Sequence, residues 1–109
     1  MAKFMALAKY SPDAAKGVVE TGPATREEYV RKALAESGAK VEALYFVEGG
    51  EWDLVVIGDI ADVPGSAVAT YLSNQGAGIY ANWRGYRLFT GAEVQAAIGQ
   101  VTALTRPGS

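Results

Sequence analysis

The strongest constraint on the fold comes from residues 52–60, which read Trp-Asp-Leu-Val-Val-Ile-Gly-Asp-Ile. The segment has the pattern of a β-strand, in which side chains alternate between two faces, and here both faces are apolar at their centre. One face carries Leu54 and Val56, and the other carries Val55 and Ile57. A chain of 109 residues has enough helix to cover only one face of the sheet that contains this strand. We therefore expect the other face to meet a second subunit.

The composition excludes several kinds of chemistry. Without cysteine the chain has no disulfide, thiolate nucleophile or iron–sulfur cluster, and without histidine it lacks the commonest metal ligand, haem ligand and near-neutral acid or base. Its acidic residues are scattered, so we expect neither a metal site nor a cofactor. A formal net charge of -2 gives no long-range attraction for nucleic acid or anionic lipid, and we expect neither as a partner.

Length and hydropathy indicate one folded domain. Half of the residues are apolar and a fifth are charged, which is the balance of a folded domain rather than of a disordered chain. We place a single domain at residues 1–104 and a flexible tail at 105–109. No stretch approaches the roughly 20 apolar residues that a membrane span needs, and the apolar run Phe4 to Ala8 is too short for an export signal. These features predict a cytoplasmic protein without a membrane partner.

Glycine, proline and capping residues along the chain predict an order of elements. We expect strands at residues 3–10, 40–47, 51–60 and 79–88, with helices after the first, third and fourth of them. The residues expected to cap these helices are Ser11, Thr25, Asp62 and Thr90, with Glu28 and Glu93 completing capping boxes. Pro12 suits the first position of its helix. The Gly-Gly pair at 49–50 suits a primed turn, which would make the second and third strands an antiparallel hairpin.

This order predicts an α+β, ferredoxin-like β-α-β-β-α-β fold with a four-stranded antiparallel sheet and helices on one face. On the fourth strand, large aromatic residues fall on both sides, with Trp83 on one and Tyr80 and Tyr86 on the other. Such clusters are more apolar surface than a soluble monomer usually exposes. We therefore expect a homodimer, or a higher homo-oligomer, in which two sheets face each other.

Two segments carry a resemblance to a known family. Residues 3–17 read Lys-Phe-Met-Ala-Leu-Ala-Lys-Tyr-Ser-Pro-Asp-Ala-Ala-Lys-Gly, and residues 50–57 read Gly-Glu-Trp-Asp-Leu-Val-Val-Ile after Tyr45 and Phe46. They resemble the start of the GYD-domain proteins and the segment that names them, and the resemblance extends to about Ala97. The Gly-Tyr-Asp motif is matched by Gly50 and Trp52-Asp53, with Glu51 inserted and tryptophan in place of tyrosine. The resemblance implies a ferredoxin-like chain that assembles as a dimeric α/β barrel, and it implies no particular biochemical activity.

One glycine-rich segment fits a nucleotide-binding pattern formally. Residues 76–81 read Gly-Ala-Gly-Ile-Tyr-Ala, which is the dinucleotide fingerprint with a final alanine. That fingerprint needs a strand before it and a helix after it, whereas here a helix precedes and a strand follows. We therefore interpret the glycines as the end of a helix.

Residues 80–87 form the richest patch, because aromatic and basic side chains interleave there. Strict alternation would place four of them on one face, namely Tyr80, Asn82, Arg84 and Tyr86, and Trp83 and Arg87 on the other. The shared face could line a mostly apolar cavity with a few polar groups. We favour a purely structural role for this patch, as part of the core or of a dimer interface in which Arg84 pairs with Asp53 or Asp59. Stacking of nucleic-acid bases is disfavoured because no basic field surrounds the patch.

Asp53 is the strongest candidate among the carboxylates for a catalytic group. It could be a base with a raised pKa, or it could bond backbone amides at the hairpin, and we favour the structural role. Asp53 and Asp59 would lie roughly 20 Å apart along the strand, so they cannot act as a close pair.

Three functions remain open. The leading hypothesis is a non-catalytic homo-oligomeric module that binds a small, partly apolar molecule or serves in assembly. Its candidate ligand-binding residues are Trp52, Tyr80, Asn82, Trp83, Arg84 and Tyr86. The alternative is a cofactor-free enzyme of mono-oxygenase or isomerase type, in which Trp52 and Trp83 stack the substrate. In that enzyme Asn82 or Arg84 would stabilise an oxyanion and Asp53 would move the proton. The third is an oligomeric scaffold with a filled interior and no ligand.

Overall fold

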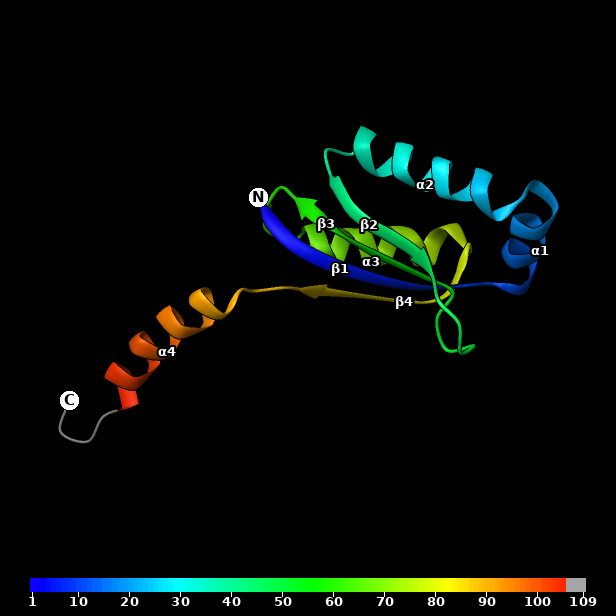
Figure 1. The fold of residues 1–109 in the computed structure, drawn as a ribbon. Helices are drawn as coiled ribbons and strands as arrows, with labels where there is room; N and C mark the ends of the chain where they lie inside the picture. Colours follow the sequence, from blue (N-terminus) through cyan, green and yellow to red (C-terminus); the bar gives the residue numbers. More distant parts are fainter. Residues whose placement is uncertain (106–109) are drawn as a thin grey trace.

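The computed structural model describes residues 1–105 and has the element order of a ferredoxin-like fold (Figure 1). The elements are β1 (Ala2–Tyr10), α1 (Pro12–Thr21), α2 (Pro23–Glu36), β2 (Lys40–Phe46), β3 (Leu54–Ile60), α3 (Ser66–Ala77), β4 (Tyr80–Arg87) and α4 (Gly91–Thr105). The predicted α+β class is confirmed. Thr105, the first residue of the predicted tail, ends α4, and residues 106–109 lie outside the described residues.

The four strands form one antiparallel sheet in the order β2-β3-β1-β4. The sheet of this single chain is open and does not close into a barrel. A barrel made from two chains therefore stays a prediction. In the register of the central strands, Leu7 of β1 lies opposite Val55 of β3, and on its other side opposite Arg84 of β4.

Two helices pack on the same face of this sheet. Val30 of α2 belongs to the buried core together with Ala8 of β1 and Leu54 of β3. Trp83 of β4 lies opposite Ala8, so the two share a face, and its ring contacts Tyr71 of α3 with the ring centres 6.5 Å apart. We call this side of the sheet the covered face.

The opposite side, which we call the open face, presents the alternate residues of the same strands. On β1 these include Met5 and Leu7, which lie opposite Ile57 and Val55 of β3. All four are only half-buried, and Tyr45 of β2, opposite Val55, is 67% exposed. The open face therefore has the apolar centre that the sequence predicted for it.

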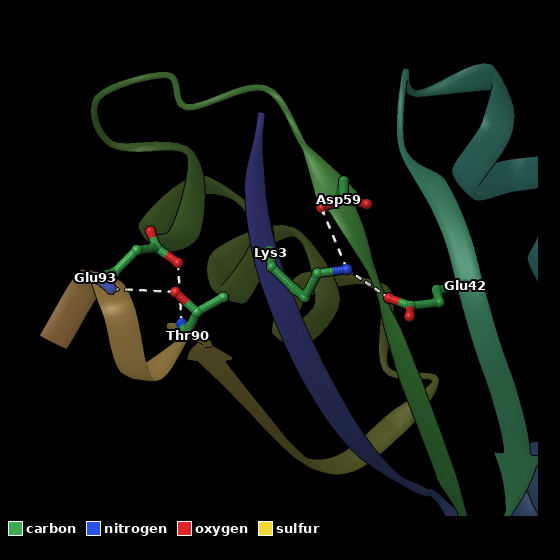
Figure 2. A network of polar contacts seen from close by, with 5 residues as sticks. All are labelled: Lys3, Glu42, Asp59, Thr90 and Glu93. Carbon is green, nitrogen blue, oxygen red and sulfur yellow. Dashed lines mark hydrogen bonds and ion pairs between the residues drawn. The ribbon is translucent and has the colours of Figure 1, made fainter.

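Two predicted helix caps are confirmed. The Ser11 hydroxyl accepts the Ala14 N–H at 3.3 Å, with Pro12 at the first position of α1. At α4 the Thr90 hydroxyl accepts the Glu93 N–H at 3.1 Å, and the Glu93 carboxylate accepts the Thr90 N–H at 2.9 Å (Figure 2). Both caps involve only residues three apart, so the local sequence determines them.

Two other predicted caps are wrong. The helix expected to start at Thr25 begins at Pro23, because proline already has the φ of a first helical residue. Gly22 precedes it and supplies no side-chain cap. Asp62 does not cap α3, which begins at Ser66, and its carboxylate pairs instead with Arg87 at 3.2 Å.

The connection between β2 and β3 is a longer loop than the predicted tight turn. Gly49 and Gly50 have the expected positive φ values of 126° and 83°, but the strand predicted from residue 51 begins only at Leu54. Residues 47–53 form the loop, which is closed by the Val47 N–H donating to the Asp53 carbonyl at 2.9 Å. The Asp53 N–H in turn donates to the Ala8 carbonyl, so this end of the loop is fixed to β1.

The last helix leads away from the sheet (Figure 1). The chain is accordingly elongated, with principal extents of 64 × 26 × 24 Å. Val94 and Ile98 of α4 are about half exposed, at 47% and 57%. None of the helices within residues 1–105 combines the length and the apolar character that crossing a bilayer requires.

Candidate functional site

A wide apolar groove lies on the covered face, between α2 and α3. Its volume is about 700 Å³. Small side chains of β1, Ala6 and Ala8, lie at the bottom of the groove, together with Gly85 of β4. The larger apolar side chains around them are those of Phe4, Val30, Leu34, Leu54, Val56 and Val68. The groove exists because alanines occupy positions of β1 where larger residues would fill the space between the helices, while the ring of Trp83 lies over Gly85.

Aromatic side chains line one side of the groove. Trp83 and Tyr80 of β4 both border it, and Tyr71 of α3 supports the Trp83 ring. The Tyr80 ring stacks on Tyr10, which is 95% buried, with ring centres 5.6 Å apart and planes inclined by 29°. The aromatic wall is therefore supported from behind by packing.

Tyr80 carries a hydroxyl group that lies near Tyr10 and Arg26. Burial raises the pKa of Tyr80, and the nearby Tyr10 raises it further, whereas the guanidinium of Arg26 lowers it. Because the net shift is upward, the phenol stays protonated at neutral pH and can both donate and accept a hydrogen bond.

An ion pair marks the opposite end of the groove. Arg87 and Asp62 both border it, with Nη1 3.2 Å from Oδ1. Both side chains are more than half exposed, so the pair contributes little to stability. It does leave charged hydrogen-bonding groups at the rim of an apolar groove.

A register shift divides the predicted ligand-binding residues between the two faces. The shift, between Lys9 and Tyr10, places Tyr80 opposite Tyr10 and therefore on the covered face with Trp83. The alternation expected for Tyr80 is thus broken. Asn82 and Arg84 lie on the open face, opposite Lys9 and Leu7. Tyr86, opposite Met5, contributes to the edge of the groove, and Trp52 lies in the loop before β3.

Asp53 has a structural environment. Its carboxylate accepts the Tyr10 N–H at 2.9 Å and lies 3.7 Å from the Lys9 ammonium. Asp53 therefore joins the end of β1 to the loop before β3, and the amide that its carboxylate accepts is that of Tyr10 rather than one of the predicted hairpin turn.

At the other end of the sheet, Lys3 bridges three strands. Its ammonium contacts Glu42 of β2 and lies 3.6 Å from Asp59 of β3 (Figure 2). The expected pairing of Arg84 with Asp53 or Asp59 is not formed, and Arg84 has no ion pair with any residue of the described range 1–105.

The residues expected to act together in a cofactor-free enzyme are divided between the two faces of the sheet. Trp83 borders the groove on the covered face. On the open face, Arg84 lies opposite Leu7, and Asn82 lies opposite Lys9, whose ammonium is 3.7 Å from the Asp53 carboxylate. No group of three acidic side chains that could hold a metal ion occurs in the part of the chain that the structure describes. The groove itself offers an apolar binding surface.

Sequence reasoning missed most of the groove itself. Phe4, Ala6 and Ala8 alternate along β1, and two alanines in succession on one face were the available signal for empty space above the sheet. The contribution of Val30 and Leu34 could not be read in the same way, because it depends on how far α2 lies from α3.

Comparison with known proteins identifies a family. The family model of the GYD domain matches residues 4–98 of the 109-residue chain. The match covers β1 from Phe4 onward, the other three strands and both helices that border the groove. Neither the search of curated proteins nor that of solved structures returned a match.

Proposed function

The chain belongs to the GYD domain family, and we propose that it is a homo-oligomeric protein whose subunits each bind a small, partly apolar molecule in the groove between α2 and α3. The observation that carries the proposal is the groove. Its volume of about 700 Å³ falls within the range of roughly 300–1,000 Å³ that small-molecule sites occupy.

The lining defines the class of ligand. Aliphatic side chains and the faces of Trp83 and Tyr80 favour a flat or branched apolar body. The rim pair of Arg87 and Asp62 favours a polar group at the end of that body. A ligand of this kind gains from leaving water without having to surrender many hydrogen bonds.

The open face supports self-assembly. Met5, Leu7, Val55 and Ile57 give it an apolar centre, while Lys3 and Lys9 already have carboxylate partners within the chain. Two copies facing each other would remove these apolar side chains from water. The groove lies on the opposite side of the sheet, so dimerisation by this face leaves it accessible.

Native mass spectrometry of protein purified from its host tests the natural ligand, and a defined probe tests the groove. Trp52→Phe leaves Trp83 as the sole tryptophan, whose indole N–H resonance then reports on the groove during titration with 2-naphthol. Ala6→Phe fills the floor and should weaken binding by about tenfold or more, whereas Ala35→Phe, on the exposed side of α2, should not. Equal binding by both variants would refute the groove as the site.

Sedimentation velocity tests the assembly. The wild type should sediment as a dimer or a multiple of it, and Ile57→Lys should yield folded monomers because it places a charge at the centre of the open face. Val19→Lys, at a position of α1 that is 77% exposed, is the matched control and should leave the oligomer unchanged. A wild-type monomer at high protein concentration would contradict the proposed assembly.

A further inference from the structure

A second, smaller cavity lies at the end of the sheet where β1 leads into α1. Its volume is about 280 Å³, and Ala14 and Val18 of α1, Ile79 before β4, and Tyr10 and Arg26 border it. It is distinct from the groove, because Tyr10 borders the cavity, Tyr80 borders the groove, and the two rings stack on each other.

Arg26 is the charged group of this cavity, and tyrosines hold its guanidinium in place. Its Nε donates to the Tyr10 hydroxyl at 3.2 Å. Its central carbon lies 5.3 Å from the centre of the Tyr10 ring and 5.0 Å from that of Tyr29, both within the range of cation–π contacts. The side chain is therefore oriented by packing, by the Tyr10 hydroxyl and by the nearby Tyr80 hydroxyl, which leaves part of its five N–H groups for a ligand.

Within the described residues, no carboxylate neutralises this guanidinium. Arg31, one turn further along α2, pairs with Glu27, and Arg87 pairs with Asp62, but Arg26 forms no ion pair within residues 1–105. It is nevertheless partly buried. Shielding a cation from water without a counter-charge is unfavourable, so an anion in the cavity would be bound strongly by comparison with one at an exposed arginine.

The start of helix α2 also favours an anion near Arg26. Arg26 lies in the first turn of α2, whose cap residue Gly22 provides no side-chain acceptor and whose first residue is Pro23. The amides of this turn form the positive end of the helix, and no side chain of the cap neutralises them. The helix end adds to the field of the guanidinium in the same region.

We propose that this cavity binds a small apolar monocarboxylate, of the size and shape of benzoate. The terminal nitrogens of Arg26 would receive the carboxylate in a two-bond fork, and the Tyr10 ring with the side chains of Ala14, Val18 and Ile79 would enclose the apolar part. A single guanidinium among apolar walls matches one negative charge with an apolar body, rather than a phosphate, whose larger charge calls for further cations.

The test is a titration of the full chain with benzoate, followed by the backbone amide resonances of Gly17 and Val18 and the Arg26 side-chain N–H. Benzamide, which has the same shape and no charge, is the matched probe. Benzoate should shift these resonances and bind about tenfold or more tightly than benzamide. The indole resonance of Trp83, which reports on the groove, should stay unchanged, so this result does not depend on the proposed function of the groove.

Variants decide which group binds the anion. Arg26→Gln should weaken benzoate binding by about tenfold or more, while Arg31→Gln removes the same charge from the same helix and should leave it unchanged. Ala14→Leu keeps Arg26 and fills the cavity from α1, so it should also abolish binding even if Arg26→Gln fails to fold. The proposal is overturned if Ala14→Leu binds benzoate like the wild type, if Arg26→Gln and Arg31→Gln have equal effects, or if no resonance shifts at concentrations on the order of 10 mM.

Discussion

Replacing Gly58 with alanine should destabilise the sheet although the backbone at this position is ordinary. Gly58 lies in β3 opposite Phe4 of β1 and Val41 of β2. Its φ is not positive, so alanine can adopt the same backbone conformation. The obstacle is steric, because an added Cβ would lie 2.3 Å from the Lys40 carbonyl oxygen. β2 comes this close where its register shifts between Val41 and Ala43.

The magnitude follows from what would have to move. The Cβ would overlap the carbonyl oxygen by about 1 Å and would also come within 3.2 Å of a Phe4 ring carbon, and the first of these contacts is with backbone. Forcing an extra carbon into such a site costs about 1–3 kcal/mol. Restricting the unfolded chain returns about 0.4–1 kcal/mol. Taking the middle of each range, we expect the free energy of unfolding to fall by about 1.3 kcal/mol, which lowers the melting temperature by about 5–10 °C for a domain of this size.

Urea unfolding followed by far-ultraviolet circular dichroism measures this loss, with all variants compared at one protein concentration because assembly contributes to apparent stability. Gly17→Ala is the matched control. Gly17 lies inside α1, nothing lies within 4 Å of the added carbon, and its φ is not positive. This change should raise stability by up to about 1 kcal/mol. If the free energy of unfolding of Gly58→Ala lies within about 0.5 kcal/mol of that of the wild type, the steric argument fails.

Three further changes probe other contacts. Gly85→Ala would place its Cβ 2.6 Å from the Trp83 ring, which can rotate away. We expect the free energy of unfolding to fall by at most about 1 kcal/mol and the near-ultraviolet circular dichroism spectrum to change. An unaltered spectrum would contradict the packing of Trp83 over Gly85. Asp53→Ala should cost about 1–2 kcal/mol in urea unfolding because the Tyr10 N–H loses its acceptor, and Asp53→Asn should cost less, so equal losses would assign the effect to charge instead. Hydrogen bonds with the Thr90 N–H and the Thr90 hydroxyl lower the pKa of Glu93. The cap of α4 is therefore complete above the ordinary glutamate pKa of about 4.3, and it is lost as the pH falls through the lower pKa that Glu93 has in the folded protein. The protection of the Thr90 amide against exchange, relative to the intrinsic rate at each pH, should therefore fall in the wild type as the pH drops below the ordinary glutamate pKa, and it should show no such pH dependence in Glu93→Gln.

Local patterns predicted the elements well. The cap at Ser11 and the capping box at Thr90 and Glu93 depend on residues within one turn, so the sequence contains everything that decides them. The order of strands followed from where glycine and proline interrupt the apolar runs. The start of α2 was misjudged because two local signals compete there, and Pro23 prevails over Thr25.

The candidate sites could be predicted only in part, because they depend on contacts between distant segments. Trp83 was singled out by its residue type, but the face on which Tyr80 lies depends on a register shift opposite Lys9 and Tyr10. Arg26 was not singled out at all. On the helical pattern it is one charged residue among several, and it becomes distinctive only when the end of β1 brings Tyr10 against it. The hydrophobic periodicity of a strand (two residues) or of a helix (3.6 residues) contains no information about a contact of that kind.

The distribution of side-chain size on β1 connects the two proposed surfaces. In a sheet stabilised only by its own helices, the larger apolar residues belong beneath the helices and the smaller or polar ones face water. β1 reverses this arrangement at its centre, with Ala6 and Ala8 on the covered face and Met5 and Leu7 on the open face. The covered face is thereby left with a groove that its own helices do not fill, and the open face with apolar area that no element among the described residues covers. A ligand on one side and a second copy on the other would account for both halves of the reversal, whereas a scaffold with a filled interior would account only for the second.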